Sequence, residues 1–280
     1  MRFGSWRWPS LLAVCGPLVL TAGAARPASA WGRSAHQLVD EHATQALPKG
    51  PKGFFRAHRL EMPTFAPDAE GPGEEGAERR FATEHFGPFP FRDLPLTEAA
   101  ARARLPEAAQ DAGRLPWLVQ ESYDALVQRF RDRQKADILA EADRLAALVT
   151  DLHNPLAVTE DWDGQRAGQS GLWVRFSVRL PEALEGRLSV DPDVAVLIDD
   201  PHGFVFSILR ASYVWFDNVL YEDDLASRTS AGQGDLYYDS LRERLKPVVQ
   251  ARLRAAAQNV ASYWYSAWVA AGKPELETLK

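Results

Sequence analysis

Residues 236–271 are the feature that most limits the folds open to this chain, because they form its longest helical stretch. Gly272 and Pro274 follow this stretch directly, and both residue types end helices. Pro247 lies inside it, where a proline either bends a helix or begins its main part. A second segment, residues 201–221, is apolar nearly all the way round, which is typical of a helix in the middle of a bundle. Together the two segments predict an all-α, multi-helix bundle.

Four further segments have the apolar spacing and boundary residues of helices, namely residues 34–47, 53–61, 116–131 and 135–151. The last of them carries the clearest apolar stripe, which is expected to face the core. That stripe consists of Ile138, Ala142, Leu145, Ala146 and Val149.

The connecting segments are less regular. Residues 63–78, 158–171 and 225–234 are rich in glycine, proline or polar residues and predict loops. Residues 172–180 alternate between apolar and polar types, which favours a short strand. The aromatic, proline-rich segment 86–91 is expected to be irregular and packed on the core. No internal repeat and no linker is visible, so a single domain is expected.

Residues 1–30 have the features of a secretory signal peptide. A positively charged start is followed by an apolar stretch and then by Ala28-Ser29-Ala30, which offers small residues to a signal peptidase. The apolar stretch is shorter than the roughly 20 residues of a transmembrane helix. We therefore expect an exported protein, periplasmic or secreted, with a mature chain of residues 31–280. The alternative is a lipoprotein signal ending at Cys15, although that cysteine lies inside the apolar run.

Charge and cysteine content narrow the chemistry of the expected mature chain. The leader carries three arginines and no acidic residue, so its removal changes the formal net charge from −6 to −9. A net acidic chain is a poor electrostatic match to duplex DNA or to an anionic membrane, although a local phosphate or metal site stays open. Cys15 is the only cysteine and lies in the leader. The mature chain therefore has neither a disulfide nor a thiolate zinc site.

Two short segments carry residues that could bind a metal. A free amino group at Trp31 could chelate a cation together with the Trp31 carbonyl, and His36 lies one helical turn further on. The alternative is a buried aromatic anchor beside a histidine. Asp151 and His153 stand at the end of a predicted helix, where their side chains could converge on a ligand. The alternative there is a network that bonds the free backbone groups of the helix end.

The other motifs give weaker evidence for a functional site. Residues 161–168 contain aspartates and glycines but lack the alternating ligands and the closing glutamate of a calcium loop. His85 stands beside an acidic residue without a further partner at metal spacing. The sequence shows no G-x-S-x-G elbow of a serine hydrolase and no glycine-rich phosphate loop.

Taken in order, the motifs resemble the secreted zinc-dependent phospholipase C and single-strand-specific zinc nuclease superfamily, and more closely a bacterial branch of it. The resemblance runs from Trp31 to about Pro274. It implies an all-α domain of this type over residues 31–280, with a three-zinc cluster at the bottom of a cleft that cleaves phosphodiester bonds. The segments that carry it are Trp31-Gly32, His36, Phe54-Phe55, Pro67-Asp68, Phe86-Gly87-Pro88-Phe89-Pro90-Phe91, Leu115-Pro116-Trp117, the Asp151-Leu152-His153-Asn154-Pro155-Leu156 run, Asp163-Gly164-Gln165 and Ser262-Tyr263-Trp264-Tyr265-Ser266-Ala267-Trp268.

The resemblance assigns metal ligands one position at a time. Four ligand positions of the family match Trp31, His36, Asp68 and Asp151, the last of which corresponds to the aspartate that bridges two zinc ions. Five others are replaced, because the family has histidines or an acid where this sequence has residues that do not match. The replacements are Arg79, Ala147, Ala157, Trp173 and Ser177.

These replacements limit the expected zinc content to at most one well-held ion. Zinc needs about four ligands, and Trp31, His36 and Asp151 could still supply three. A second ion would have only Asp68 and a share of Asp151. Alanine has no donor atom, and the permanent positive charge of Arg79 repels a cation. The Arg79 guanidinium could instead bind a phosphate ester, either of nucleic acid or of a phospholipid headgroup.

Three hypotheses follow for the function. The first is a catalytically degenerate member that keeps the fold. The second is a phosphodiester hydrolase with a reduced zinc site, in which zinc-bound water attacks, Asp151 holds the ion and Asp68 orients the water or acts as base. The third is an unrelated exported helical protein. The sequence also leaves open whether His85 or His153 replaces a lost ligand.

Overall fold

A computed structural model describes residues 30–62, 74–229, 232–277 and 279. Every regular element within these ranges is a helix, which confirms the all-α class, and no strand occurs among them. The leader, residues 1–29, lies outside the described ranges. The main helices are α1 (Arg33–Ala46), α2 (Pro51–His58), α3 (Glu98–Arg104), α4 (Pro106–Asp111), α5 (Leu115–Asp132), α6 (Lys135–Leu152), α7 (Leu180–Ala183), α8 (Pro201–Tyr213), α9 (Phe216–Ser227) and α10 (Asp235–Ala270).

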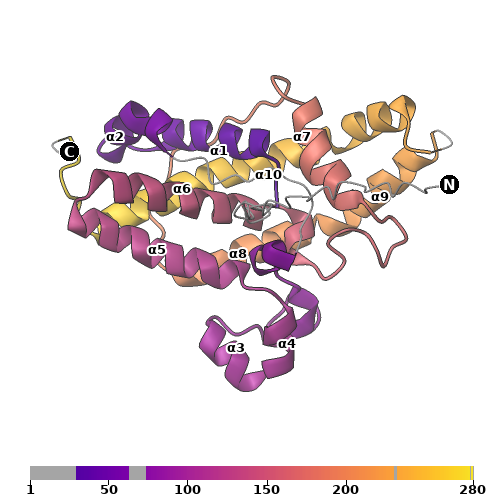
Figure 1. Cartoon of the computed structure of the whole chain (residues 1–280), viewed down its shortest axis with the longest axis horizontal. Coiled ribbons are helices and arrows are strands. Elements are labelled where there is room, and N and C mark those ends of the chain that lie inside the picture. Colours follow the sequence, from indigo (N-terminus) through magenta and orange to yellow (C-terminus); the bar gives the residue numbers. More distant parts are fainter. Residues whose placement is uncertain (1–29, 63–73, 230–231, 278, 280) are drawn as a thin grey trace, which may run out of the picture.

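The long helix α10 is the axis of the bundle, with α1, α5, α6 and α9 packed against it (Figure 1). It runs without interruption through Pro247, so this proline neither breaks the helix nor begins it. The helix ends as its sequence predicts. Gly272 takes the left-handed conformation that glycine tolerates best, with φ of 88°. Lys273 N then donates to Trp268 O over 2.9 Å and closes the last turn.

Helices α5 and α6 form an antiparallel pair on one side of α10. Arg133 joins them in a left-handed conformation, and its amide donates to the carbonyl of Arg129. The predicted apolar stripe of α6 is confirmed, because all five of its members are fully buried. Burial of such a stripe is the main source of helix stability in a bundle. Helix α6 ends at Leu152, directly after Asp151.

The apolar segment 201–221 is two helices rather than the single one predicted. Helix α8 ends at Tyr213, and Trp215 N donates to Ser212 O in a tight turn before α9 begins. Apolar composition all round a segment cannot distinguish one buried helix from two that change direction. Not all of its apolar residues are buried, since Val214 is 55% and Tyr221 59% exposed. Helix α9 also extends to Ser227, into a segment predicted to be a loop.

Residues 172–180 are helical, so the predicted strand is wrong. Residues Val174–Arg179 form a π-helical turn that continues into α7. The alternation of apolar and polar types misled the prediction because two of the three polar members are buried as well. Arg175 is buried in an ion pair with Asp223, and the Ser177 hydroxyl accepts a hydrogen bond from Asn154. A strand with one solvated face would have left both exposed.

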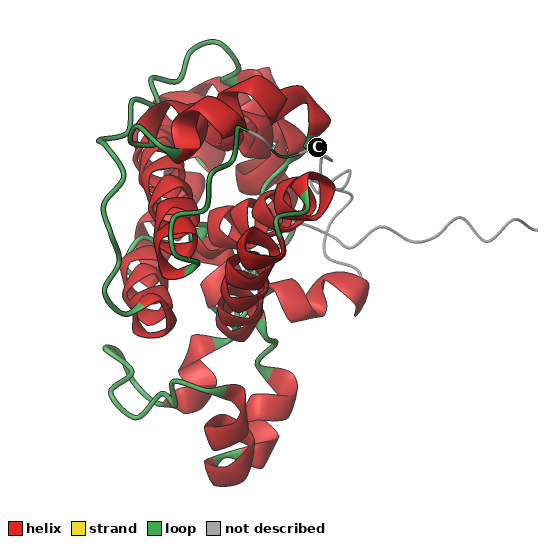
Figure 2. Cartoon of the chain, turned by 90° about the vertical axis from the view of Figure 1, so that its left-hand side faces the viewer, coloured by secondary structure: helices red, strands yellow, loops and turns green. Residues whose placement is uncertain are grey.

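The remaining segments complete the picture. Residues 158–171 form the predicted turns, whereas residues Glu74–Arg79 form a short 3₁₀ helix where a loop was predicted. In the aromatic segment, Phe86 and Phe91 are buried as expected and Phe89 is half exposed. Helices α3 and α4 project from one side of the bundle in both views (Figures 1 and 2). No helix among the described residues is long and apolar enough to cross a membrane.

Candidate functional site

The strongest candidate site surrounds Asp151 at the end of α6. Its side chain is fully buried, although a carboxylate alone would be costly to bury. Trp31 and His36 approach it from the start of α1, and Arg79 approaches from the last turn of the 3₁₀ helix Glu74–Arg79. The structure thus brings together three of the four predicted metal ligands and the predicted phosphate-binding arginine. The fourth ligand, Asp68, lies outside the described residues.

One carboxylate oxygen of Asp151 contacts three nitrogen atoms at and just before the start of α1. Asp151 Oδ1 lies 2.8 Å from the backbone nitrogen of Ala30, 3.3 Å from that of Trp31 and 3.1 Å from His36 Nε2. When Asp151 is ionised, His36 Nε2 carries the proton and donates it. The same nitrogen would have to give up that proton to bind a metal ion.

The other oxygen of Asp151 faces Arg79. Arg79 Nη2 lies 2.5 Å from Asp151 Oδ2, and the arginine side chain is only 10% exposed. The guanidinium therefore compensates the carboxylate charge on the side where a bridging aspartate would contact a second ion. A buried pair of this kind is destabilised strongly when one partner is removed. Arg79 is paired inside the protein, and its predicted role toward a phosphate ester stays a prediction.

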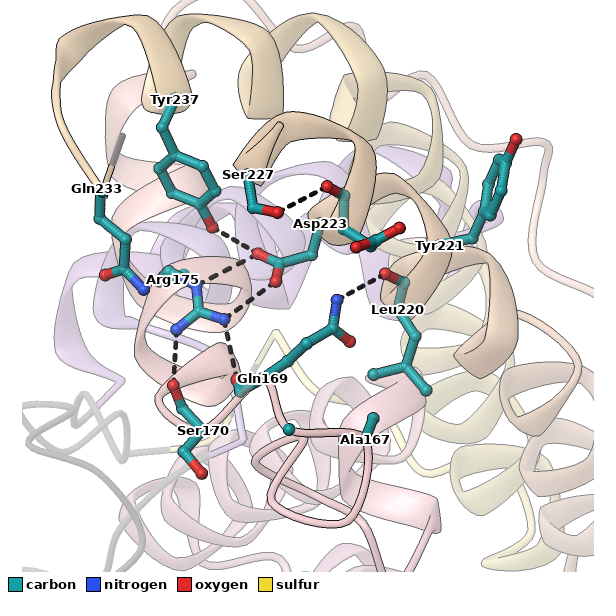
Figure 3. Close-up of a pocket in the computed structure, with 13 residues that line it drawn as sticks. Ala167, Gln169, Ser170, Arg175, Leu220, Tyr221, Asp223, Ser227, Gln233 and Tyr237 are labelled. Atoms are coloured by element: carbon teal, nitrogen blue, oxygen red, sulfur yellow. Dashed lines mark hydrogen bonds and ion pairs between the residues drawn. The ribbon is translucent and has the colours of Figure 1, made fainter. Parts of the chain in front are cut away.

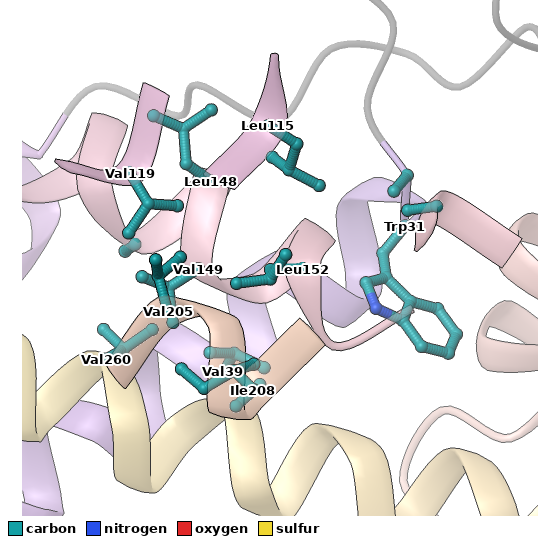
Figure 4. Close-up of a cluster of buried hydrophobic side chains, with 14 of the residues drawn as sticks. Trp31, Val39, Leu115, Val119, Leu148, Val149, Leu152, Val205, Ile208 and Val260 are labelled. Carbon is teal, nitrogen blue, oxygen red and sulfur yellow. The ribbon is translucent and has the colours of Figure 1, made fainter. Parts of the chain in front are cut away.

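The residues on both sides of the expected cleavage point contact the protein interior. In the uncleaved chain Asn154 Nδ2 donates to the carbonyl of Ala30, the last leader residue, over 2.5 Å, and it also donates to Ser177 Oγ over 2.8 Å. Gly32 N donates to the Ser177 carbonyl over 2.9 Å. The Trp31 indole packs on Phe176 at the edge of the apolar cluster shown in Figure 4. Trp31 is thus a buried aromatic anchor whose backbone nitrogen also reaches Asp151, and its role as a metal ligand stays a prediction.

The replaced positions do not provide metal ligands. Ala147 and Ala157 are buried with methyl side chains, Trp173 is buried, and Ser177 is engaged with Asn154. Within the described ranges no group of three or more histidine, cysteine, aspartate or glutamate side chains is placed to hold an ion. The described residues around Asp151, which do not include Asp68, therefore lack the several ligand groups that three zinc ions spaced about 3.5–4 Å apart would need.

His153 does not replace a lost ligand, because both ring nitrogens are bonded within the protein. His153 Nδ1 donates to Val149 O over 2.7 Å, and Asn259 Nδ2 donates to His153 Nε2 over 2.9 Å. This is the helix-end network that the sequence left open as an alternative. Burial and the positive charge of Arg252 lower the pKa of His153 to about 3, so the ring is neutral at physiological pH.

The depressed pKa of His153 predicts a pH-dependent stability. The unfolded chain has the ordinary pKa near 6.5, so it takes up a proton between pH 6.5 and about 3 while the folded chain does not. The contribution is complete above pH 6.5 and is lost as the pH falls, by up to about 1.4 kcal/mol per pH unit. Urea unfolding at pH 7 and pH 5 measures it. The His153→Gln variant should show a flatter dependence, and an equally steep one would contradict this assignment.

The other candidate residues also have structural partners. His85 Nε2 lies 3.5 Å from Glu160 Oε2, and no contact with Asp151 is found for it among the described residues. Asp161 accepts hydrogen bonds from the backbone amides of Arg166 and Ala167, and Asp163 accepts from those of Gly171 and Trp173. These carboxylates hold the turns of residues 158–171 together, as expected of a structural loop rather than a calcium site.

Sequence reasoning missed a second buried ion pair, between Arg175 and Asp223 (Figure 3). Arg175 Nε and Nη2 donate to the two Asp223 oxygens over 3.1 and 3.0 Å, and the Tyr237 hydroxyl donates a hydrogen bond to Asp223 Oδ1. Nη2 also donates to the Gln169 carbonyl, and Nη1 donates to the Ser170 carbonyl. This network lines a cavity of about 670 Å³. The only local signal in the sequence is an arginine directly between two apolar residues, Val174 and Phe176.

Comparison of the chain with protein-family models and with curated proteins finds no match to either.

Proposed function

We propose that this chain is an exported protein of the zinc phospholipase C and nuclease type whose catalytic centre is degenerate. In this proposal Arg79 replaces a metal ion as the positive charge beside Asp151, and the protein does not turn over phosphodiesters. The single observation that carries the proposal is the buried contact of Arg79 Nη2 with Asp151 Oδ2, at 2.5 Å. It concerns the residue that the family resemblance assigns to the bridging position.

The charges around Asp151 support this proposal. An incoming zinc ion would meet a carboxylate whose charge is already compensated by a guanidinium that cannot be deprotonated. It would also have to break the contact between His36 and Asp151. If the mature chain begins at Trp31, the new amino group adds another positive charge within 3.3 Å of Asp151 Oδ1. The Arg79 charge, the His36–Asp151 contact and the new amino group each disfavour the binding of a further cation beside Asp151.

The test is a phosphodiesterase assay on exported protein whose N-terminus has been sequenced as Trp31. Hydrolysis of bis(p-nitrophenyl) phosphate and of phosphatidylcholine is measured with and without added zinc. The proposal expects no turnover above a heat-inactivated sample in either case. Zinc-dependent turnover that disappears in both the Asp151→Asn and His36→Gln variants would overturn it. A chain that begins elsewhere than Trp31 would overturn the predicted leader.

The second candidate is a hydrolase with a single zinc ion and a phosphate-ester substrate, from nucleic acid or a phospholipid headgroup. One observation favours it: Trp31 N and His36 Nε2 both lie within 3.3 Å of the same oxygen, Asp151 Oδ1. These are the groups that the resemblance assigns as ligands. This candidate expects zinc-dependent hydrolysis that is lost in His36→Gln, whereas the degenerate centre expects no difference between that variant and the wild type.

A further inference from the structure

Arg79 and Arg80 are consecutive but take part in different sites. Arg79 meets Asp151, whereas the Arg80 guanidinium lies over the ring of Trp162, with 4.2 Å between the guanidinium carbon and the ring centroid. Arg80 lines a cavity of about 450 Å³ between the 3₁₀ helix Glu74–Arg79, helix α4 and the turns of residues 158–171. Cavities of this size hold small organic ligands.

Arg80 differs from the other arginines of this cavity because it has no carboxylate partner within the described ranges. No hydrogen bond or ion pair of its guanidinium is found among the described residues, and its Nε is buried without a partner. Burial lowers the pKa of Arg80 to about 10, which shows that its surroundings disfavour the charge. The other three arginines of the cavity, Arg102, Arg114 and Arg166, each contact a glutamate. The face of Trp162 compensates Arg80 only in part, because a ring offers no acceptor to the N–H groups.

Arg175, which lines the cavity of about 670 Å³, is an arginine whose hydrogen bonds and charge are accounted for by protein groups. There, each nitrogen of Arg175 donates a hydrogen bond within the protein, and Asp223 balances its charge (Figure 3). That cavity presents no uncompensated charge to a ligand through Arg175. The smaller cavity does so through Arg80.

We propose that the cavity beside Trp162 binds a small organic molecule through a singly charged carboxylate held by the Arg80 guanidinium. A carboxylate accepts two parallel hydrogen bonds from a guanidinium, which matches the unpaired N–H groups of Arg80. Glu78, Asp111 and Glu160 also line the cavity and disfavour a doubly charged phosphate monoester. The volume leaves room for an organic body beyond the carboxylate. This site is independent of the question of zinc at Asp151.

Calorimetric titration of the full mature protein with benzoate tests the proposal, with benzamide as the uncharged analogue and inorganic phosphate as the competing anion. Benzoate should bind at one site with a dissociation constant below about 1 mM and more tightly than either control ligand. The Arg80→Gln variant should weaken benzoate binding by at least about tenfold. The Arg56→Gln variant, which removes an exposed arginine on α2, should leave it within about twofold.

A second variant keeps the test decisive if Arg80→Gln does not fold. Gln110 is an exposed residue on the rim of the cavity, so Gln110→Glu adds a negative charge without disturbing the core. It should weaken benzoate binding severalfold at low ionic strength. Absence of benzoate binding to the wild type, equal binding by Arg80→Gln or by Gln110→Glu, or tighter binding of inorganic phosphate would each overturn the proposal.

Discussion

Replacing Asp151 by asparagine is expected to lower the free energy of unfolding by about 3–5 kcal/mol, as measured by urea denaturation at pH 7. Asparagine has nearly the same shape, so the loss is one of charge. It leaves the Arg79 guanidinium buried without a counter-charge, because Asp151 Oδ2 is its contact at 2.5 Å. The matched control is Asp137→Asn on the exposed side of the same helix, which should change the stability by no more than about 0.5 kcal/mol.

A double-mutant cycle separates the ion pair from general disruption of the core. Arg79→Met removes the guanidinium with little loss of volume. The Asp151→Asn/Arg79→Met double variant should be more stable than the sum of the two single changes predicts, with a coupling energy of about 1–3 kcal/mol. A coupling energy near zero would mean that Arg79 and Asp151 do not depend on each other. That result would contradict the assignment of Arg79 as the charge that replaces a metal ion.

Replacing Asp223 by asparagine is the second change expected to destabilise the protein by about 3–5 kcal/mol. Asp223 is the counter-charge of Arg175 and also accepts a hydrogen bond from the Tyr237 hydroxyl, and all three side chains are largely buried. Burial, together with the charge of Asp223, raises the pKa of Tyr237 well above its ordinary value, so the tyrosine stays protonated and must donate. Asparagine would leave Arg175 without a counter-charge, and its amide NH2 would face one of these donors in place of an acceptor.

The adjacent residue provides the control for this second prediction. Asp224 is partly exposed and pairs with Arg228 one helical turn further on. Asp224→Asn should therefore change the free energy of unfolding by less than about 1 kcal/mol in the same denaturation experiment. If the two variants lost equal stability, the Arg175–Asp223 pair would not be the link that fixes the π-helical turn to α9.

Helix positions could largely be predicted from the sequence, because apolar periodicity and terminal glycine or proline are local signals. Examples of such local signals are the apolar stripe of α6 and Gly272, which lies just after the end of α10. The strand predicted at residues 172–180 is wrong because Arg175 and Ser177 are buried through partners that lie far away in the chain. A pattern of residue types carries no information about such partners. The division of residues 201–227 into α8 and α9 depends on tertiary packing for the same reason.

The candidate site, too, could be predicted from the sequence only in part. The convergence of Trp31, His36 and Asp151 was expected from the family resemblance, and the structure places all three together. The resemblance also assigned Arg79 to a lost ligand position, but it predicted a role toward a phosphate ester. In the structure, the guanidinium instead contacts Asp151. The sequence analysis includes Asn154 in a motif but predicts no role for it, whereas in the structure its side chain bonds both Ala30 and Ser177.

Zinc stoichiometry tests the central claim, which is that Arg79 replaces a metal ion beside Asp151. Exported protein with Trp31 at its N-terminus is equilibrated with excess zinc, desalted and measured by elemental analysis, with His36→Gln as the comparison. The account predicts near-zero zinc in both proteins and a melting temperature that a chelator does not change. About one tightly bound zinc per chain that His36→Gln loses, or two or three zinc ions per chain, would contradict it.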